Sequence, residues 1–499
     1  MWRKELKKYQ KETDWQALTA IFLFLALAAI VPSVKIFFLL AFALLSFLVL
    51  KYSFPKAFVY ASLPLSYVSM AQTHSILVVP AKAIVSNQYW EGRHLAYGFS
   101  PYFFIALIAL LLIFFWQKKL KKIKLKSYHL AAFAFILCGF LSAFYASLMP
   151  GLSIISVLAQ MSVLTFAWYI SALLIHLDEP KKQKLLLTLF LILSSLIFYE
   201  SLFVFKQTLN QSPVGLAIEA AQFAPVFGLG SDESGSFRPF GLQAHPNGLA
   251  NQQLTLVSAV FLIFAFLQKK GSKIPIQKIL IFVFILALTN IVLSLSRAAF
   301  VVIFMVFLLL WIRHLELITK INQTIQKKLR QIPIGYKLFF IAILAFLFFR
   351  LSDRLLYSIY SFSEFGGVNT RAIQYAEAME VFKKSPIFGI GDRMFIPTSY
   401  QLFPKGVMTY FPEEVHSGLL LVFIERGLLG GTAYFIFLLI LLKKINKTKL
   451  LPSTKSVLYS GLIAGLVMMI FHPERNFFSF FMLLTMAILE NKHDYKFTN

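Results

Sequence analysis

A histidine preceded closely by two glutamates lies where a polar loop turns into a long apolar run. The segment FPEEVHSGLLLVFIERGLLGG covers residues 411–431 and contains Glu413, Glu414 and His416. Because a charge in lipid is costly, an ionisable residue at the edge of such a run needs a reason. An imidazole with an ordinary pKa of about 6.5 can take a proton from a hydroxyl group at neutral pH. His416 is therefore a candidate catalytic base. Glu413 or Glu414 could orient it or serve as the base, and a simple helix-capping role for His416 is the alternative.

Arginines lie at similar junctions elsewhere in the chain. Arg238 in SFRPFGLQAHPNGL precedes an apolar run, Arg297 in LSLSRAAFV joins two such runs, and Arg371 begins the stretch RAIQYAEAMEVFKK. A guanidinium group holds phosphate oxygens in pairs and keeps its charge, so three of them on one membrane face predict a site for a lipid-anchored diphosphate. Contact with lipid headgroups is the alternative for Arg297, as is an ion pair with Glu377 or a headgroup for Arg371.

Three further polar residues are candidates for binding a sugar or an acceptor molecule: His245, Glu200 and Arg475. A metal ion could neutralise a diphosphate as well, but the segments on this face contain no DxD or His-x-x-His cluster to hold one. Glu413 and Glu414 form the one close acidic pair there. We therefore expect no metal and no cofactor.

The elements that must position these residues are membrane helices. The chain of 499 residues is 58% hydrophobic and only 14% charged, which leaves too little polar surface to cover a soluble core. Apolar runs of roughly 17 to 22 residues recur along it, the length that a helix needs to cross a bilayer. We predict an all-α polytopic membrane protein with about 12 to 14 transmembrane helices.

The net charge of +26 reports orientation in the membrane rather than nucleic-acid binding. The lysines gather in short connections between apolar runs, such as KKLKKIKLK from Lys118, EPKKQK from Glu179 and KKINKTK from Lys443. When spans are counted alternately from a cytoplasmic N-terminus, all of the basic connections fall on the cytoplasmic side. Membrane lipids are therefore expected partners, and nucleic acid is not.

Two connections are too long to be simple turns, and both fall on the outer face. They divide the chain into five parts. These are N-terminal transmembrane helices (1–205), a first outer loop (206–248), central transmembrane helices (249–351), a large outer loop (352–414) and a C-terminal part with transmembrane helices and a cytoplasmic tail (415–499). We expect an amphipathic helix in the large loop, capped by Asn369 or Thr370. Its predicted apolar face is Ala372, Tyr375, Ala376, Met379 and Phe382.

An ordered series of motifs carries a family resemblance. The chain contains SRAAF, then R-x3-Y-x2-A-x3-F-x3-P-x2-G-I-G from Arg371 to Gly391, then H-S-x9-G-x2-G from His416 to Gly430. This ordered set resembles the O-antigen ligase and O-antigen polymerase superfamily of bacterial glycosyltransferases. The likeness covers the C-terminal half, from about Arg238 onward. It implies a metal-independent, inverting enzyme with a GT-C-like fold, in the bacterial inner membrane, with its active site facing the periplasm or the cell exterior.

The resemblance also implies substrates and roles. The donor would be a glycan linked to undecaprenyl diphosphate, held by the outer-face arginines, and the histidine would assist the acceptor hydroxyl. The acceptor could be lipid A core sugar, as in a ligase, or a growing glycan, as in a polymerase. The H-S-x9-G-x2-G spacing favours a ligase. A flippase or transporter of lipid-linked oligosaccharides is the alternative from a different class, although such a protein should carry polar residues at mid-membrane depth.

Overall fold

The computed structural model describes the helical bundle and much of the large loop. The described residues are 13–30, 34–71, 78–80, 96–98, 126–215, 237–243, 245–267, 275–296, 298–303, 305, 367–406, 414–448, 450, 452–471 and 485. All structural statements below concern these residues.

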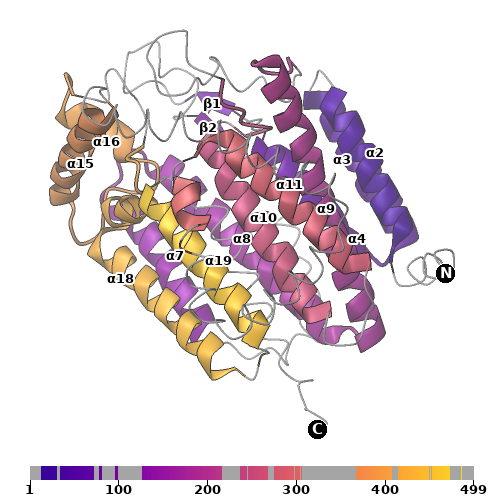
Figure 1. Ribbon diagram of the computed structural model, residues 1–499. Coiled ribbons are helices and arrows are strands. Elements are labelled where there is room, and N and C mark those ends of the chain that lie inside the picture. The colour runs from indigo at the N-terminus through magenta and orange to yellow at the C-terminus, as the bar shows by residue number, and fades with distance from the viewer. Residues whose placement is uncertain are drawn as a thin grey trace, which may run out of the picture.

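The described chain is almost entirely helical (Figure 1). Its helices are α2 (Trp15–Ile30), α3 (Val34–Lys51), α4 (Phe54–Ala71), α7 (Ser127–Tyr145), α8 (Pro150–His176), α9 (Glu179–Asn210), α10 (Pro246–Leu267), α11 (Pro275–Ser294), α15 (Gly367–Lys384), α16 (Phe395–Leu402), α18 (Gly418–Lys447) and α19 (Pro452–Phe471). Two short strands, β1 (Val78–Pro80) and β2 (Ala96–Gly98), pair antiparallel with Val79 opposite Tyr97.

The predicted fold class, an all-α polytopic membrane protein, is confirmed. Six described helices are long and apolar enough to cross a membrane: α7, α9, α10, α18 and most of α11 and α19. Shorter apolar helices occur at Trp15–Ile30, Leu39–Lys51 and Pro150–Met161. Large apolar side chains point outward, among them Leu50 at 83% and Leu209 at 81% exposure, as expected for helices that face lipid. Predicted spans near 100–116, 336–351 and 476–490 lie wholly or almost wholly outside the described residues, so the full span count stays a prediction.

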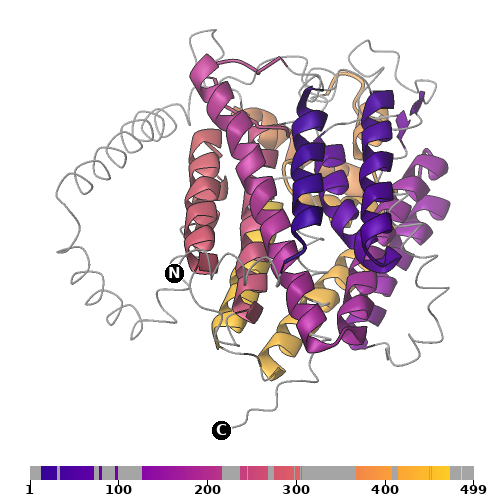
Figure 2. The same cartoon turned by 90° about the vertical axis from the view of Figure 1, so that its right-hand side faces the viewer.

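The helices form one bundle, with α2 and α3 on one side and α7 and α18 on the other. Helices α2 and α3 lie at the right-hand edge of Figure 1, α7 and α18 lie at the lower left, and α10 is between them. Figure 2 shows α2 and α3 from the side, standing roughly parallel to each other. One apolar core joins α2, α3 and α4 to α9, α10 and α11, and a second joins α7, α10, α18 and α19.

Both predicted long loops contribute to the same end of this bundle. Before α10, the amide of Leu242 donates to Glu200 near the end of α9. In the large loop, the amide of Gly391 donates to Ser142 near the end of α7. The lysine-bearing connection between α8 and α9 lies at the opposite end, where Lys184 and Lys56 pair with Asp14. The described parts of the two long loops therefore contact the same end of the bundle, and the membrane side that this end faces stays a prediction.

The large loop forms a helical lid, which we define as residues 367–406. Its core consists of Val381, Met394 and Phe395, which belong to one apolar cluster with Leu421 and Ile424 of α18. The lid contains α15 and α16, so the expected helical character of this loop is confirmed. Because its core is shared with α18, the lid is held against the segment that carries His416.

The predicted apolar face of α15 is wrong in part. Ala372, Ala376 and Met379 are exposed, whereas the buried positions are Gln374, Glu377, Ala378 and Val381. Glu377 accepts a hydrogen bond from Ser399 of α16 at 3.1 Å. Polar groups therefore lie on the packed side of α15, and a pattern that counts only apolar residues points to a neighbouring face. The helix also begins at Gly367, before the expected caps, which places Arg371 beyond its first four residues.

Candidate active site

The loop before α10 is fixed by two polar side chains of α9. Gln207 accepts hydrogen bonds from the amides of Phe240 and Gly241, at 3.0 and 2.8 Å, and donates to the Gly241 carbonyl at 2.7 Å. Glu200 accepts from the amide of Leu242 at 2.8 Å and is fully buried. This geometry gives Glu200 a role in positioning the loop, and does not place it where a sugar could contact it as the sequence analysis expected.

Arg238 is held at the junction between this loop and α11. Its Nε donates to the carbonyl of Ser294 at 3.1 Å, and its Nη2 donates to the carbonyl of Leu295 at 3.3 Å and to Asn247 at 3.4 Å. Leu295 has a positive φ of 56°, so the chain turns sharply where α11 ends. The guanidinium group of Arg238 therefore bridges the end of α11 and the beginning of α10, next to Ser296 of the SRAAF motif.

His245 lies directly before α10. Its Nδ1 accepts a hydrogen bond from the amide of Asn247 at 3.1 Å. Burial, followed by the positive charge of Arg238 and then by His416 and Arg371, lowers the pKa of His245 from 6.5 to about 3. The ring is consequently neutral at physiological pH. That Arg238, His416 and Arg371 all influence His245 electrostatically shows that the four side chains lie in one neighbourhood.

His416 lies between Glu414 and the beginning of α18. Ser417 caps this helix by accepting from the amide of Leu420 at 3.2 Å, so the cap is the serine rather than the histidine side chain. Tyr375 of α15 donates its hydroxyl to the His416 carbonyl at 3.1 Å. The Nδ1 of His416 faces Oε1 of Gln374 at 3.4 Å. Two adjacent lid residues thus hold the histidine in place.

The surroundings keep the His416 ring neutral. Burial, and after it the positive charge of Arg371, lower the pKa of His416 from 6.5 to about 4. Arg371 itself is exposed on α15. A neutral imidazole beside an exposed guanidinium can accept a proton from a hydroxyl group while the cation holds an anionic ligand.

Four of the predicted site residues thus come together from separate parts of the sequence: Arg238, His245, Arg371 and His416. Glu414 is half-buried two residues before His416. Three other candidates lie outside the described residues: Arg297, Glu413 and Arg475. Their assignments stay predictions. Within the described residues, no group of three or more His, Cys, Asp or Glu side chains is arranged to hold a metal ion.

The lid is hydrogen-bonded to the bundle at the point where α18 is interrupted. Gly427 has φ 64° and ψ −170°, which interrupts the helix nine residues after it begins at Gly418. The exposed backbone groups pair with the lid: the amides of Ile390 and Gly391 donate to the carbonyls of Ile424 and Glu425, and the amide of Leu428 donates to the carbonyl of Pro386. The backbones approach so closely that a Cβ on Gly427 would lie 2.1 Å from the Ile387 carbonyl oxygen. This contact explains why glycines recur in both the FGIG and the H-S-x9-G-x2-G segments.

The comparison with known families agrees with this arrangement. Residues 282–435 match the family model described as O-antigen ligase. This match covers less than half of the chain, and it supports the resemblance of that part to the O-antigen ligase and polymerase superfamily. No curated protein matches the chain significantly.

The O-antigen ligase match covers most of the site but not all of it. It includes α15, the first half of α18, and therefore Arg371 and His416. Arg238 and His245 precede it, and enter the site because the loop before α10 folds back onto the end of α11. The protein is thus a multi-pass membrane protein whose matched segment resembles the O-antigen ligase family, and the loop before α10 adds Arg238 and His245 from outside that segment.

The sequence analysis missed a buried ion pair between the lid and α18. Arg426 binds Asp392 through two hydrogen bonds of 2.8 and 2.7 Å, and both side chains are fully buried. Arg426 also donates to Gln160 of α8 and to the carbonyl of Phe135 on α7, over whose ring it lies at 4.1 Å. The available signal was the pair of charges in VFIERGLLGG, inside an apolar run where charge is expensive.

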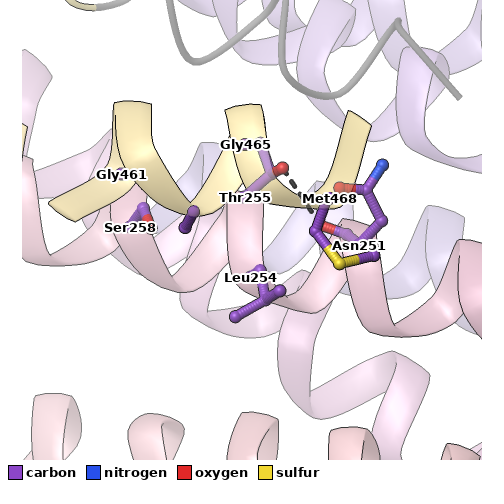
Figure 3. Close-up of a pocket in the computed structure, with 8 residues that line it drawn as sticks. Asn251, Leu254, Thr255, Ser258, Gly461, Gly465 and Met468 are labelled. Atoms are coloured by element: carbon purple, nitrogen blue, oxygen red, sulfur yellow. Dashed lines mark hydrogen bonds between the residues drawn. The ribbon is translucent and has the colours of Figure 1, made fainter. Parts of the chain in front are cut away.

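A small hollow between α10 and α19 is separate from these residues (Figure 3). Asn251, Thr255 and Ser258 line it on α10, facing Gly461 and Gly465 on α19. The hydroxyl group of Thr255 donates to the Asn251 carbonyl within the same helix at 3.0 Å. Small residues at such a contact allow membrane helices to approach closely. None of the candidate site residues lines the hollow, so we interpret it as a feature of helix packing.

Proposed function

We propose that this protein transfers a glycan from an undecaprenyl-diphosphate carrier to an acceptor hydroxyl at the outer face of the bacterial inner membrane. The observation that supports the proposal most strongly is that Arg238 and His245, held at the beginning of α10, lie near His416, which α15 and its Arg371 contact from the lid. Lysine-rich connections lie at the other end, and the preference of such connections for the cytoplasm orients the site outward.

The arginines would hold the diphosphate and stabilise it as it leaves. Negative charge grows on the bridging oxygen as its bond to the anomeric carbon breaks, and preorganised cations lower the energy of that transition state. Arg371 is exposed at the lid and Arg238 is anchored on the bundle, so the two can approach a membrane-held ligand from different elements. Arg297, one residue after Ser296, is proposed as the third cation.

His416 would act as the base, so that the reaction needs no metal ion. A neutral imidazole takes the proton of the acceptor hydroxyl as its oxygen attacks the anomeric carbon from the side opposite the diphosphate, which inverts that carbon. Glu414 and Glu413 would orient the histidine or the acceptor. His245 and Arg475 are proposed to contact acceptor or glycan groups.

A transfer assay tests this proposal directly. Purified protein in detergent, supplied with an undecaprenyl-diphosphate-linked glycan and an acceptor bearing a free hydroxyl, should form product at the same rate with and without excess chelator. A requirement for magnesium or manganese would reject the arginine mechanism. If no transfer occurs with any diphosphate-linked donor, the proposed activity itself is wrong.

The glycans of a deletion strain distinguish a ligase from a polymerase, which use the same donor. We place the ligase first because of the spacing between His416 and Gly430. Loss of the protein should then leave complete polymer on its lipid carrier. Accumulation of single repeat units would assign a polymerase, and accumulation on the inner leaflet would assign a flippase.

A further inference from the structure

Gln374 is a buried amide that faces the candidate base. It lies on α15 three residues after Arg371, a spacing that places both on neighbouring parts of the helix surface. Only 1% of Gln374 is exposed, and its Oε1 lies 3.4 Å from Nδ1 of His416. The other amide atom, Nε2, is buried and has no hydrogen-bond partner within the described part of the chain. The side chain thus lies on the packed side of α15 and contacts His416 there.

The contact with the Gln374 oxygen favours one position for the proton of a neutral His416 ring. An amide oxygen can only accept hydrogen bonds, so the nitrogen that faces it must carry the hydrogen. With the proton on Nδ1, the lone pair is on Nε2, which is then the basic atom. The Tyr375 hydroxyl holds the backbone of the same histidine at 3.1 Å, so the ring is attached to α15 at two points.

His245 has the opposite arrangement. Its Nδ1 accepts the amide hydrogen of Asn247 at 3.1 Å, so in the neutral ring the proton is on Nε2. In the neutral rings, one imidazole of the site therefore has its lone pair on Nε2, and the other has its N–H there. Among the described residues, the charged and titratable groups near His416 include Arg371 and Tyr375 on the lid, Arg238 and His245 on the loop before α10, and Glu414 on its own segment.

We propose that Gln374 is a positioning residue that holds His416 in the Nδ1–H tautomer, so that Nε2 takes the proton of the acceptor hydroxyl. This inference rests on the proposed glycosyl transfer. In that step the acceptor oxygen forms its bond to the anomeric carbon while its proton moves to Nε2 of His416. The bond from the anomeric carbon to the diphosphate oxygen breaks, and the diphosphate leaves with the electron pair. The charges balance without a further reactant.

Substitutions at Gln374 separate an acceptor role from a donor role. Gln374→Glu keeps only acceptor oxygens toward Nδ1, so transfer should stay within about threefold of wild type, and the acid limb of the pH profile should move upward because a carboxylate favours imidazolium. Gln374→Leu removes the acceptor, and kcat should fall on the order of tenfold to a hundredfold with little change in the KM for the lipid donor. Gln374→Lys presents only donors and should be as impaired as Gln374→Leu.

The reverse ordering would overturn the inference. If the Lys variant is active and the Glu variant is not, the amide donates to Nδ1 and His416 is not a base at Nε2. If all three variants keep the wild-type rate and pH profile, Gln374 has no positioning role. The matched control is Gln253→Leu, which removes a fully buried glutamine that contacts Asn290 in the bundle. It should leave the wild-type pH profile, and thermal unfolding of every variant identifies those that fold poorly.

A second measurement is independent of glycosyl transfer. The rate at which diethyl pyrocarbonate modifies His416, followed peptide by peptide across pH, reports the pKa of that ring. Gln374→Glu should raise this pKa and Gln374→Leu should not. If the shift is seen but no diphosphate-linked donor reacts, the positioning contact stands and the proposed function fails. If transfer occurs but the pKa does not respond to Gln374→Glu, the contact is refuted and the proposed function stands.

Discussion

The candidate site combines neutral imidazoles with permanent cations. Burial is the larger reason that His416 and His245 stay neutral, and the charge of the nearby arginines adds to it. A base that is buried among cations remains unprotonated at neutral pH, whereas the arginines keep their charge under all physiological conditions. The same residues thus supply a proton acceptor and an anion site without competing for protons.

Substituting an arginine should weaken donor binding and transfer, whereas substituting His416 should slow transfer alone. Arg371→Ala or Arg238→Ala should remove a charge-assisted contact of roughly 1.5 to 3 kcal/mol and lower kcat/KM about tenfold to over a hundredfold. Lysine at either position should restore only part of it, because a point charge does not reproduce the paired geometry. His416→Ala should bind donor normally but transfer about a hundredfold more slowly. Donor binding and turnover must be measured separately, and a wild-type rate for His416→Ala would remove the histidine from the mechanism.

The pH profile should reflect the depressed pKa of His416. Because the folded pKa is lowered from 6.5 to about 4, the neutral base persists as pH falls through 6.5 and is lost only near pH 4. The acid limb of kcat should therefore lie well below pH 6. Arg371→Gln removes a cation that opposes protonation, so the limb should move to higher pH even though the overall rate is lower. A limb at 6.5 in both proteins would show that the imidazole is solvated.

Sequence reasoning located the ionisable residues of the site because charge at the edge of an apolar run is rare. It gave no indication of Gln374, since an amide in an amphipathic helix looks like part of a solvated face. Glu200 was predicted to contact a sugar, but the buried carboxylate holds the Leu242 amide instead. Whether a polar side chain belongs to the site depends on its hydrogen-bond partner. That partner comes from tertiary contacts, which cannot be read from the spacing of residues along the chain.

At the level of elements, the lid and the bundle meet through backbone contacts at the interruption of α18. Two glycines with positive φ, Gly389 and Gly427, face each other across it, where a Cβ would collide with backbone atoms. Their sequence spacing was recognised as a family motif, but the reason for it, a helix whose open backbone groups pair with another segment, appears only in three dimensions. The misassigned face of α15 has the same origin, because its packed side is partly polar.

Gly427→Ala should loosen the lid. The new methyl group would lie 2.1 Å from the Ile387 carbonyl, in addition to the strain of an alanine at φ 64°. We expect a lower unfolding temperature and faster proteolysis within the lid. Gly215→Ala is the matched control: its φ is 85°, but no atom lies within 4 Å of the new Cβ, so only backbone strain of about 1 to 2 kcal/mol applies. Equal effects of the two substitutions would argue against the close backbone contact.

The buried ion pair should hold the lid to α7 and α8. Asp392→Asn leaves the guanidinium of Arg426 without its charged partner in a fully buried site, which typically costs about 3 to 5 kcal/mol. Thermal unfolding in detergent should show a large loss of stability. Replacing both partners, as in Asp392→Asn with Arg426→Met, should recover much of it.

An exposed ion pair on the same lid provides the comparison. Glu380 and Lys383 are one helical turn apart on α15 and both are solvent-accessible, so Glu380→Gln should change stability very little. If Asp392→Asn is as mild as Glu380→Gln, the buried pair does not connect the lid to the bundle.

At the scale of the whole molecule, the fold class follows from composition, since apolar runs of membrane length leave few alternatives. The lysine-rich connections also predict which end of the bundle faces the cytoplasm, and this orientation stays a prediction. The neighbours of each helix were not predictable: α10 contacts α9, α11 and α19, which are spread over more than 250 residues of sequence. Helices that are apolar on most faces carry little information about which face meets which partner.

The orientation of the bundle in the membrane can be tested with single cysteines. In a Cys138→Ser background, cysteines would replace exposed lysines at both ends: Lys384 and Lys405 on the lid, and Lys181 and Lys447 at the lysine-rich end. A thiol reagent that does not cross the inner membrane should label the lid positions in intact cells and the other two only after permeabilisation. The reason is energetic, because basic connections are retained in the cytoplasm during insertion. The lid and His416 share one end of the bundle, so the labelling pattern also places the candidate base. Labelling of Lys181→Cys and Lys447→Cys in intact cells would put His416 in the cytoplasm, where a periplasmic acceptor could not reach it, and would overturn the proposed function together with the topology.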